Sequence, residues 1–467
     1  MGAIRSPIVV AVGGLDPSGG AGLAADILAA SSLGVHVAPV AAVLTVQDTG
    51  GSVYARPVEP WVLGSQLERV MSDFGARVIK TGVLGSVSNL LVVAEAVRST
   101  GAVLVVDTVW ETGSGDPLVE DVEAYVAALR SRLIPLAEVV TLNATEASKI
   151  TGINAGSRVE AVRAARFVVE RLGARMAIVK GGHVEPWGSV VYDAVYDADR
   201  GEFFLEHPRL SPCGERGLHG TGCTFAASIA AGLALGLSRV EAARLAESIV
   251  YEAIRFAKNI GRGRCPVSPL AYVYRSASLL DAMAGVRRAA EYLVENSDVL
   301  LGYVPEVGIN IAEIIPGADS AEDAAGIVGR VVRAGRRLVM AGCPWPGGSS
   351  HMARLAIAAH RLDSSIRAAG NLVYREELVR AARVLGLSVF RARREEEPSS
   401  REGSTMQWLV RRAYEELGMV PRVIYDTGAP GKEAMVRVLG SSALEVAGLM
   451  VRLALVAGRA TRNTYKD

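Results

Sequence analysis

The sequence predicts an α/β protein of two domains: an N-terminal αβα layered sheet and a second, C-terminal α/β domain. First, short apolar runs rich in valine alternate with helix-length stretches over residues 1–260. Strands that are apolar on both faces belong to a parallel sheet covered by helices on both sides. Second, this alternation stops and later resumes, and third, 467 residues exceed the usual size of one domain.

Six apolar runs are expected as parallel strands of the first sheet. They are IVVAVGG (8–14), VAPVAAVL (37–44), RVIKTG (77–82), AVLVVDT (102–108), AEVVTLN (137–143) and MAIVKGG (176–182). Two further runs, SVVYDAVYDA (189–198) and GEFFLEH (201–207), predict a hairpin with Asp199–Gly201 at its turn. Helices over 221–237 and 239–259 would close the domain.

The stretch GRGRCPVSP (261–269) is rich in glycine and proline and ends this pattern. A helix is expected over 277–295, and a second α/β pattern begins at Gly308. The expected boundaries are a first domain over 1–270, a linker over 271–284 and a second domain over 285–467.

Composition excludes several classes of partner. With 50% hydrophobic residues and a formal net charge of +1, the chain has a core but no electrostatic footprint for nucleic acid or acidic membranes. The longest apolar run, Cys223–Leu237, is too short to span a bilayer and contains two glycines. The first apolar piece is too short for a signal peptide. We therefore expect a cytoplasmic protein with small-molecule partners.

The cysteine pattern favours a reducing compartment and argues against a zinc cluster. The four cysteines contain no CxxC pair, and they are Cys213, Cys223, Cys265 and Cys343. A disulfide between Cys213 and Cys223 is therefore not expected. For Cys223, the open alternatives are an inert core residue and a catalytic group.

Glycine and polar clusters follow the expected strands, which is where open α/β sheets bind ligands. They are GGLDPSGGAGLAADI (13–27), TVQDTGG (45–51), NATE (143–146), KGGH (180–183) and HGTGC (219–223). Singly, each has an ordinary structural interpretation. Asn143 and Glu146, for example, are typical of a helix N-cap and first turn.

The cluster HGTGC indicates more than a turn. Gly220, Thr221 and Gly222 would begin a helix whose free N–H groups form an anion site. A helix N-terminus also lowers the pKa of a thiol, so Cys223 is expected to have partial thiolate character.

In this order and spacing, the clusters resemble the ribokinase-like superfamily and, within it, the hydroxymethylpyrimidine and hydroxymethylpyrimidine-phosphate kinases. The resemblance covers about residues 6–270. It rests on DPSGGAG (16–22), Asp26, Gln47, KTG (80–82), DTV (107–109), SGDPL (114–118), Asn143, Glu146, KGGH and HGTGCT (219–224). A generic sugar kinase of the superfamily has aspartate in the place of Cys223, so the cysteine indicates the pyrimidine branch.

The resemblance implies ATP and Mg²⁺ as cofactors and assigns a role to each cluster. On the nucleotide side, the anion hole for the γ-phosphate is Gly220, Thr221 and Gly222, and Lys180 lies beside it. Asn143 and Glu146 organise the phosphates and Mg²⁺, which Glu146 holds indirectly. The residues that receive the aminopyrimidine are Asp26, Gln47 and Gly20. The lysine that family members often carry before SGDPL is absent, since Gly113 stands there, and Arg216 is the candidate to replace it.

In this family Cys223 falls where a general base is wanted. Our hypothesis is that the base serves the first phosphorylation only. A hydroxymethyl group must lose its proton before attack, whereas a phosphate monoester is already ionised, with a second pKa of about 6.

From about Ala277 the chain resembles the archaeal-type thiamin-phosphate synthase domain that is often fused to this kinase. The resemblance rests on VGINIAE (307–313), GIVGRVVR (326–333), SSHMARLAIAAHRLD (349–363), IRAAGNLVY (366–374), EEEP with EGSTMQW (402–408), and VIYDTGAPGKEAMVRVLG (423–440). It implies coupling of hydroxymethylpyrimidine diphosphate with thiazole phosphate, which releases pyrophosphate. Such a site must supply positive groups and exclude water.

Arg330 and His351 fall at the essential basic positions of that family. Other expected phosphate contacts are Ser349, Ser350, Arg354, Asp426 and Lys432. Taken alone, Arg330 fits a solvated helix residue and His351 a capping partner, and these interpretations remain open.

Two other functions remain open. In the first, the kinase is fused to a non-catalytic sensor of thiamin phosphate, although the charge supports no DNA-binding region and the basic pair is kept. In the second, the kinase acts on a pyridoxal-type alcohol, where Asp26 and Gln47 have less reason to occur. Because ribokinase-like kinases commonly dimerise, we expect a homodimer.

Overall fold

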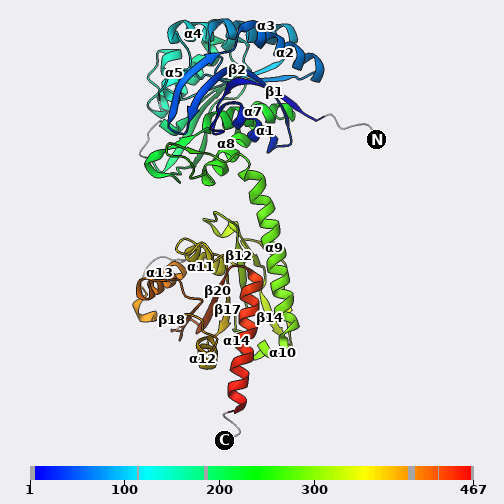
Figure 1. The fold of residues 1–467 in the computed structure, drawn as a ribbon, viewed down its shortest axis with the longest axis vertical. Helices are drawn as coiled ribbons and strands as arrows, with labels where there is room; N and C mark the ends of the chain where they lie inside the picture. Colours follow the sequence, from blue (N-terminus) through cyan, green and yellow to red (C-terminus); the bar gives the residue numbers. More distant parts are fainter. Residues whose placement is uncertain (1–5, 113–114, 184–187, 398–404, 430, 464–467) are drawn as a thin grey trace, which may run out of the picture. The chain divides into compact units, whose positions relative to one another are not determined.

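The computed structural model describes residues 6–112, 115–183, 188–397, 405–429 and 431–463 (Figure 1). The chain divides into two compact units, Met1–Val273 and Tyr274–Asp467. The segment 271–284, expected as a linker, belongs to helix α9 (Ala271–Glu295). No proline or glycine interrupts this segment before Gly285, so the helix can run through it.

The N-terminal unit contains a nine-stranded sheet in the order β3-β2-β1-β4-β5-β6-β7-β8-β9. The strands are β1 (Ile8–Leu15), β2 (His36–Asp48), β3 (Gly51–Pro57), β4 (Val78–Thr81), β5 (Val103–Asp107), β6 (Val139–Leu142), β7 (Met176–Val179), β8 (Val190–Asp197) and β9 (Gly201–Pro208). The six expected strands are the parallel centre, and the expected hairpin is β8–β9, which closes with Asp197 opposite Gly201. Strand β3, antiparallel to β2, was not expected.

Helices cover both faces of this sheet, as strands apolar on both sides require. One layer holds α2 (Pro60–Phe74), α3 (Val87–Thr100), α4 (Val122–Ala128), α5 (Ala144–Thr151) and α6 (Arg158–Leu172); the other holds α1 (Gly22–Ser31), α7 (Thr221–Ala234) and α8 (Arg239–Arg255). Along β1, Val10 and Val12 pack into the first layer's core, whereas Val9 and Ala11 pack into the second. Gly236, with φ 87°, follows the end of α7.

The C-terminal unit contains a seven-stranded sheet in the order β16-β13-β12-β17-β20-β19-β18. Its strands are β12 (Ile311–Ile314), β13 (Ala324–Ile327), β16 (Pro344–Pro346), β17 (Ala368–Val373), β18 (Val389–Arg391), β19 (Val423–Asp426) and β20 (Met435–Gly440), and β14 (Val331–Ala334) with β15 (Arg337–Met340) forms a separate hairpin. Only β18 and β19 are parallel; the other neighbours are antiparallel.

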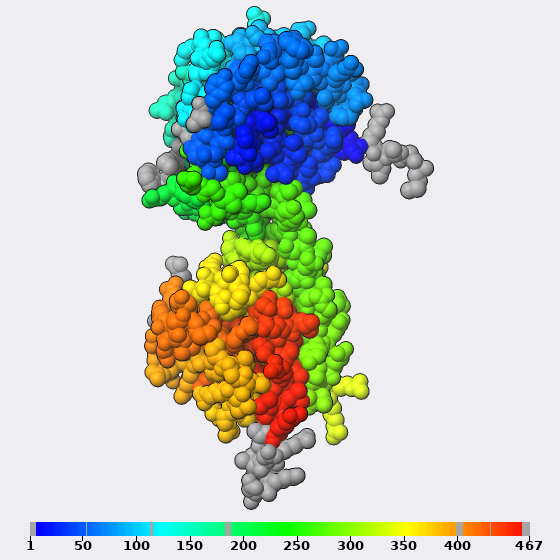
Figure 2. Space-filling model, in the orientation of Figure 1, coloured from blue at the N-terminus to red at the C-terminus, as the bar shows by residue number. Residues whose placement is uncertain are grey.

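Helices α11 (Ser350–His360) and α14 (Ala443–Asn463) lie on opposite faces of this sheet, and the remaining helices are α10 (Ser297–Leu300), α12 (Glu376–Val384) and α13 (Thr405–Leu417). A Cβ at Gly326 would meet Ser349 at the start of α11, and a Cβ at Gly370 would meet Val446 and Met450 of α14. Helix α14 reaches the surface of the unit (red in Figure 2), where Leu444 is exposed. Within the described residues, no helix is long and apolar enough to cross a membrane.

The cysteines differ from expectation in one respect. Cys213 and Cys265 form a disulfide, whereas Cys223 and Cys343 are free. The short parallel pair of β10 (Leu218–His219) and β11 (Cys265–Pro266) brings the two Cα atoms within 6.4 Å. This contact joins segments 52 residues apart, which the spacing of cysteines along the chain cannot reveal.

Candidate active site

A cavity of about 540 Å³ lies at the carboxyl ends of the central strands of the N-terminal unit. All but one of the site residues expected in this unit line it: Asp26, Gln47, Asn143, Glu146, Lys180, Gly220, Thr221, Gly222 and Cys223. Gly20 is the exception, because it lies against His219, whose ring carbon would be 2.4 Å from a Cβ at this position. The glycine is therefore required for close packing of two loops rather than for a contact with ligand.

The start of α7 lines this cavity with the features of an anion site. Gly220 is the N-cap, with φ 88°, and a Cβ there would lie 1.9 Å from the carbonyl oxygen of Gly20. Among the described residues, no side chain caps the helix. The first N–H groups of α7 are therefore left for a bound anion.

A lysine–carboxylate pair lies beside this helix start. The Lys180 Nζ is 3.0 Å from Oδ1 of Asp107, and a Cβ at Gly222 would be 3.1 Å from the same Nζ. Burial opposes ionisation of Asp107, but Lys180 and Lys80 still hold its pKa below the ordinary value. The second oxygen of Asp107 is buried and has no hydrogen-bond partner among the residues that the structure describes.

Asn143 and Glu146 form a capping box at the start of α5, so their ordinary structural interpretation holds. The Glu146 N–H donates to Asn143 Oδ1 at 2.8 Å, and the Asn143 N–H donates to Glu146 Oε2 at 2.7 Å. Burial raises the pKa of Glu146 to about 7; Lys180 lowers it and Asp107 raises it further. A bound cation would therefore stabilise the charged form of the Glu146 carboxyl group.

The donor set fits Mg²⁺ held mainly through phosphates. Within the described residues, no cluster of three or more histidine, cysteine, aspartate or glutamate side chains could hold a metal ion. Asp107 and Glu146 are among the carboxyl groups that line the cavity, and one oxygen of Asp107 has no hydrogen-bond partner among the described residues. One or two carboxylates together with phosphate oxygens and water are the usual ligands of Mg²⁺.

A second buried pair, Lys80 with Asp26, also lines the cavity. Lys80 donates to both oxygens of Asp26, at 2.7 and 2.9 Å, and each side chain is only 1% exposed. Burial raises the pKa of Asp26 to about 6, against the lowering influence of Lys80. Burial would lower the pKa of Lys80, but Asp26 and other anionic groups raise it overall.

Gln47 lies within a polar contact chain at the end of β2. Its amide nitrogen is 3.3 Å from Nε2 of His219, and the same ring nitrogen is 2.8 Å from Oδ2 of Asp16. Burial opposes ionisation of Asp16, but His219 and Ser18 hold its pKa below the ordinary value. The imidazole thus links the DPSGG turn to the strand end that carries Gln47.

Cys223 lies in the first turn of α7 as expected, but its environment does not favour a thiolate. Burial raises the pKa of the thiol to about 11; Lys80 lowers it, and Asp26 with Asp107 raises it again. The expected lowering by the helix N-terminus is therefore overcome by loss of solvent and by two nearby carboxylates.

The residues missed as site candidates are Asp16, Lys80, Asp107 and His219 in this unit. The sequence does contain a feature that could have identified Lys80 and Asp107 as site residues. Each is a charged residue inside or at the end of an apolar strand, in RVIKTG and AVLVVDT. Arg216, the candidate phosphate contact, instead donates to the carbonyl oxygen of Gly261 and to Asn259. Gly113 lies outside the described residues.

In the C-terminal unit, Arg330 occupies a strained turn before β14 and not a helix. It is the one non-glycine residue of positive φ in the described part of the chain, with φ 70°. Its guanidinium donates to the carbonyl oxygen of Val307. Such a conformation costs about 1–3 kcal/mol and is often retained at functional sites.

His351 lies in the first turn of α11, next to several cations. Partial desolvation lowers its pKa, and so do Arg354, Arg330 and Arg437. Ser349, the N-cap, is buried, its hydroxyl has no hydrogen-bond partner within the described part of the chain, and Ser350 begins the helix. The structure therefore brings Arg330, His351 and Arg354 together around a helix N-terminus.

Asp426 and Lys432 have other partners. Asp426 is fully buried and accepts from Arg437 at 2.6 Å and Arg394 at 3.0 Å, while Lys432 pairs with Glu397 at 3.0 Å. A direct contact between Asp426 and a phosphate is therefore not supported, because its carboxylate neutralises two arginines. Arg394 and Arg437 were missed; Glu402–Ser404 lie outside the described residues.

The layered sheet, the anion site at a helix start and the adjacent buried lysines define the N-terminal unit as a small-molecule kinase of the ribokinase-like fold. The chain belongs to the phosphomethylpyrimidine kinase family, whose family model matches residues 16–268. Residues 285–452 match the family model of thiamine-phosphate synthase ThiN.

Individual relatives agree with these matches. The hydroxymethylpyrimidine/phosphomethylpyrimidine kinase of Rhizobium meliloti is 37% identical over 263 residues, which cover 56% of this chain and 96% of that protein. The thiamine biosynthesis bifunctional protein ThiED of Geobacter sulfurreducens is 37% identical over 56% of this chain and 51% of its own length. The pyridoxal kinase of Staphylococcus aureus with AMP-PCP and pyridoxal is 28% identical, with a TM-score of 0.52, and the match covers 57% of this chain and 95% of that one.

Removing one partner of the buried pair should destabilise the N-terminal unit. We expect Lys80→Met to lower its free energy of unfolding by about 3–5 kcal/mol, because Asp26 is left buried without a countercharge. Lys80→Met combined with Asp26→Asn should recover part of the loss. The control is Lys149→Met, whose partner Glu123 is 82% exposed, with a loss of under about 1 kcal/mol. Urea unfolding measures all three; equal losses for Lys80→Met and Lys149→Met would contradict the account.

Closing the anion site should weaken nucleotide binding. We expect Gly220→Ala to reduce affinity for a non-hydrolysable ATP analogue by at least about tenfold, since the new methyl group collides with Gly20 and displaces the helix start. Gly34→Ala is the matched control, because Gly34 also has positive φ, 74°, but nothing lies within 4 Å of its Cβ position. Calorimetry measures both affinities. An unchanged affinity in Gly220→Ala would show that the start of α7 does not bind the nucleotide.

Proposed function

We propose that the chain is a bifunctional enzyme of thiamin biosynthesis. The N-terminal unit phosphorylates hydroxymethylpyrimidine and then its monophosphate with ATP, and the C-terminal unit couples the diphosphate to thiazole phosphate with release of pyrophosphate. The observation that carries the kinase half is one cavity that contains an anion site with Lys180 at one side and Asp26 with Gln47 at the other. The two family matches within one chain support the combination.

Phosphoryl transfer needs positioning and neutralisation of charge more than covalent chemistry. The N–H groups of Thr221 and Gly222 and the ammonium group of Lys180 would receive the γ-phosphate. Mg²⁺, when bound, supplies charge neutralisation between the phosphates, and Glu146 with Asp107 would hold it. The buried pairs keep both lysines charged and fixed, so little reorganisation is needed during the reaction.

On the substrate side, Asp26 and Gln47 would receive the aminopyrimidine. Both oxygens of Asp26 bond to Lys80, yet each carboxylate oxygen can accept more than one hydrogen bond. The solved pyridoxal kinase shares the fold, so comparing kcat/KM for the pyrimidine alcohol and for pyridoxal separates the two substrate classes.

Cys223 would take the proton of the hydroxymethyl group in the first phosphorylation. With a pKa of about 11, roughly one thiol in ten thousand is ionised at pH 7, so the step should accelerate with rising pH. The monophosphate carries an ionised nucleophile and has no such need.

Replacing the thiol should separate the two phosphorylations. We expect Cys223→Ala to lower kcat for the alcohol by about 100-fold and to leave the monophosphate step within about twofold. In the unchanged protein, the rate of the alcohol step divided by the rate of the monophosphate step should rise about tenfold per pH unit between pH 7 and 9. In Cys223→Ala this ratio should not change with pH. Quenched-flow assays with each substrate measure the rates. Equal slowing of both steps would show that Cys223 does not act as the base.

In the C-terminal unit, the difficult step is departure of pyrophosphate from the pyrimidine methylene carbon. Arg330 and Arg354 would stabilise the leaving group, and Arg437 adds positive potential. Partial desolvation and these cations lower the pKa of His351, which favours the neutral imidazole, and a neutral imidazole can both donate and accept a hydrogen bond. Ser349 and Ser350 at the start of α11 are further phosphate contacts, and Lys432 is a more peripheral one.

Substitutions of the two basic residues test the second activity. With supplied diphosphate and thiazole phosphate, Arg330→Ala and His351→Ala should each lower formation of thiamin phosphate by at least about 100-fold and leave both phosphorylations unchanged. The control is Arg336→Ala, in the exposed turn between β14 and β15. Chromatography of products measures both activities. If the unchanged protein binds thiamin phosphate but forms none, the C-terminal unit is a sensor and the proposal fails.

For the oligomeric state we predict a homodimer, and for the cellular location we predict the cytoplasm. The Cys213–Cys265 disulfide bears on the predicted location, because disulfides are uncommon in cytosolic proteins.

A further inference from the structure

The Cys213–Cys265 disulfide lies in the wall of the kinase cavity and not at a remote surface. Cys213 and the residues that follow it, up to the anion site at Gly220, all line the cavity. Cys265 is fully buried in β11. The bond therefore ties a stretch that borders the nucleotide site to the interior of the unit.

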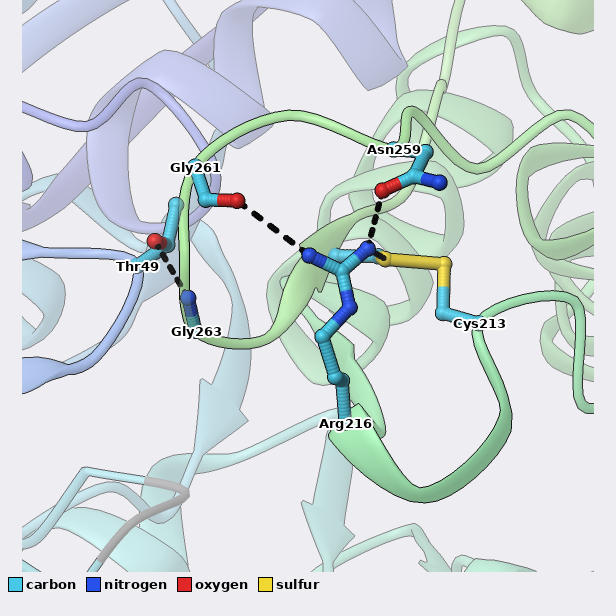
Figure 3. The surroundings of a disulfide bond; sticks show 7 residues. Thr49, Cys213, Arg216, Asn259, Gly261 and Gly263 are labelled. Carbon is cyan, nitrogen blue, oxygen red and sulfur yellow. Dashed lines mark hydrogen bonds between the residues drawn. A yellow bond between two sulfur atoms is a disulfide. The ribbon is translucent and has the colours of Figure 1, made fainter.

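The segment that carries Cys265 contacts both sides of the cavity. On the nucleotide side, the Val267 N–H donates to the carbonyl oxygen of His219 at 3.0 Å, next to Gly220. On the pyrimidine side, the Gly263 N–H donates to Thr49 Oγ1 at 3.0 Å, two residues after Gln47. Figure 3 shows the contact of Thr49 with Gly263 and the disulfide on the same segment. A shift of this segment would therefore displace backbone atoms in both binding regions.

Arg216 provides a further tie between the two stretches, beside the pairing of β10 with β11. Its guanidinium donates to the carbonyl oxygen of Gly261 at 3.2 Å and to Asn259, and one of its nitrogens lies 2.8 Å from the Cys265 sulfur (Figure 3). These contacts are polar and partly exposed, and such contacts contribute little on their own. The stretch before the anion site is exposed at Ser211, Pro212, Gly214 and Glu215 and half-buried from Arg216 to His219. The backbone hydrogen bonds that join β10 to β11 begin only at Gly217, so residues 213–215 are held to the interior mainly by the covalent bond.

We propose that this disulfide is a redox-dependent positioning element for the kinase site, which rests on the kinase half of the proposed function. When it is oxidised, the wall between Cys213 and His219 is held in the binding geometry. When it is reduced, the wall loosens and both substrates bind more weakly, while Lys180 directly after β7, Asp107 at the end of β5 and Cys223 in α7 keep their places.

The chemical step is ordinary thiol–disulfide exchange with a dithiol reductant. One thiolate of the reductant attacks a cystine sulfur, the S–S bond breaks, and a mixed disulfide forms. The second thiol of the reductant displaces the remaining cysteine. The protein gains two electrons and two protons as two thiols, and the reductant becomes a cyclic disulfide.

The test compares the oxidised and the dithiothreitol-reduced full chain. We expect reduction to raise KM for ATP and for the pyrimidine alcohol by about tenfold and to leave kcat within about twofold, because positioning is lost but the reacting groups are not. Removal of the reductant in air should restore KM. The internal control is formation of thiamin phosphate from supplied diphosphate, which should not change because it occurs in the other unit.

Two variants complete the design. Cys213→Ser should show the weaker binding permanently and should no longer respond to the reductant, whereas Cys343→Ser, at an exposed free cysteine of the C-terminal unit, should behave as the unchanged protein does. Thiol titration in denaturant without reductant should find two thiols, Cys223 and Cys343, and four after reduction.

The proposal is overturned if four thiols are present before reduction, or if KM is unchanged when four are present after it. Equal loss of both activities on reduction would also overturn it, since that indicates general unfolding. If the oxidised protein phosphorylates nothing, the proposed function fails, and the redox dependence is then read from affinity for a non-hydrolysable ATP analogue.

Discussion

Buried pairing of lysine with carboxylate is the interaction on which the kinase site depends. Lys80 with Asp26 and Lys180 with Asp107 lie beneath and beside the first turn of α7, in the space between the sheet and the helix. None of these charges could be buried alone, because removing an ion from water costs several kcal/mol. Paired, they fix the lysines near the place where a phosphate must bind, and the N–H groups of the helix add to the same positive potential. The glycines of HGTGC allow the loops to approach closely enough for this arrangement.

The same pairing determines what the neighbouring groups can do. Carboxylates close to Cys223 and Glu146, together with burial, raise the pKa values of both groups to about 11 and about 7. The C-terminal unit arranges its charges differently. There Asp426 offsets Arg394 and Arg437 within the core, and Arg330 and Arg354 are left to face the imidazole of His351. In the N-terminal unit each buried lysine is thus balanced by a carboxylate, whereas the C-terminal unit has Arg330 and Arg354 close enough to His351 to lower its pKa.

Local patterns predicted much of the fold and of the site. Valine-rich runs specify strands that are buried on both faces, so the six parallel strands could be placed, and the glycine clusters marked the strand ends that form the cavity. Strand β3 was missed because GSVYARP is short, partly polar and at the sheet edge. The Lys80–Asp26 pair, 54 residues apart, and the Cys213–Cys265 bond depend on long-range contacts that no local pattern contains. The pKa of Cys223 was misjudged because helix position is visible in sequence, whereas burial and neighbouring charges are not.

If one chain performs successive steps of thiamin formation, the amounts of its products must stand in a fixed ratio. The purified chain is mixed with hydroxymethylpyrimidine, Mg-ATP and thiazole phosphate, and the nucleotides, pyrophosphate and thiamin phosphate are quantified together. The account predicts two ADP and one pyrophosphate for each thiamin phosphate formed. Accumulation of the pyrimidine diphosphate without thiamin phosphate, or no consumption of ATP, would contradict it.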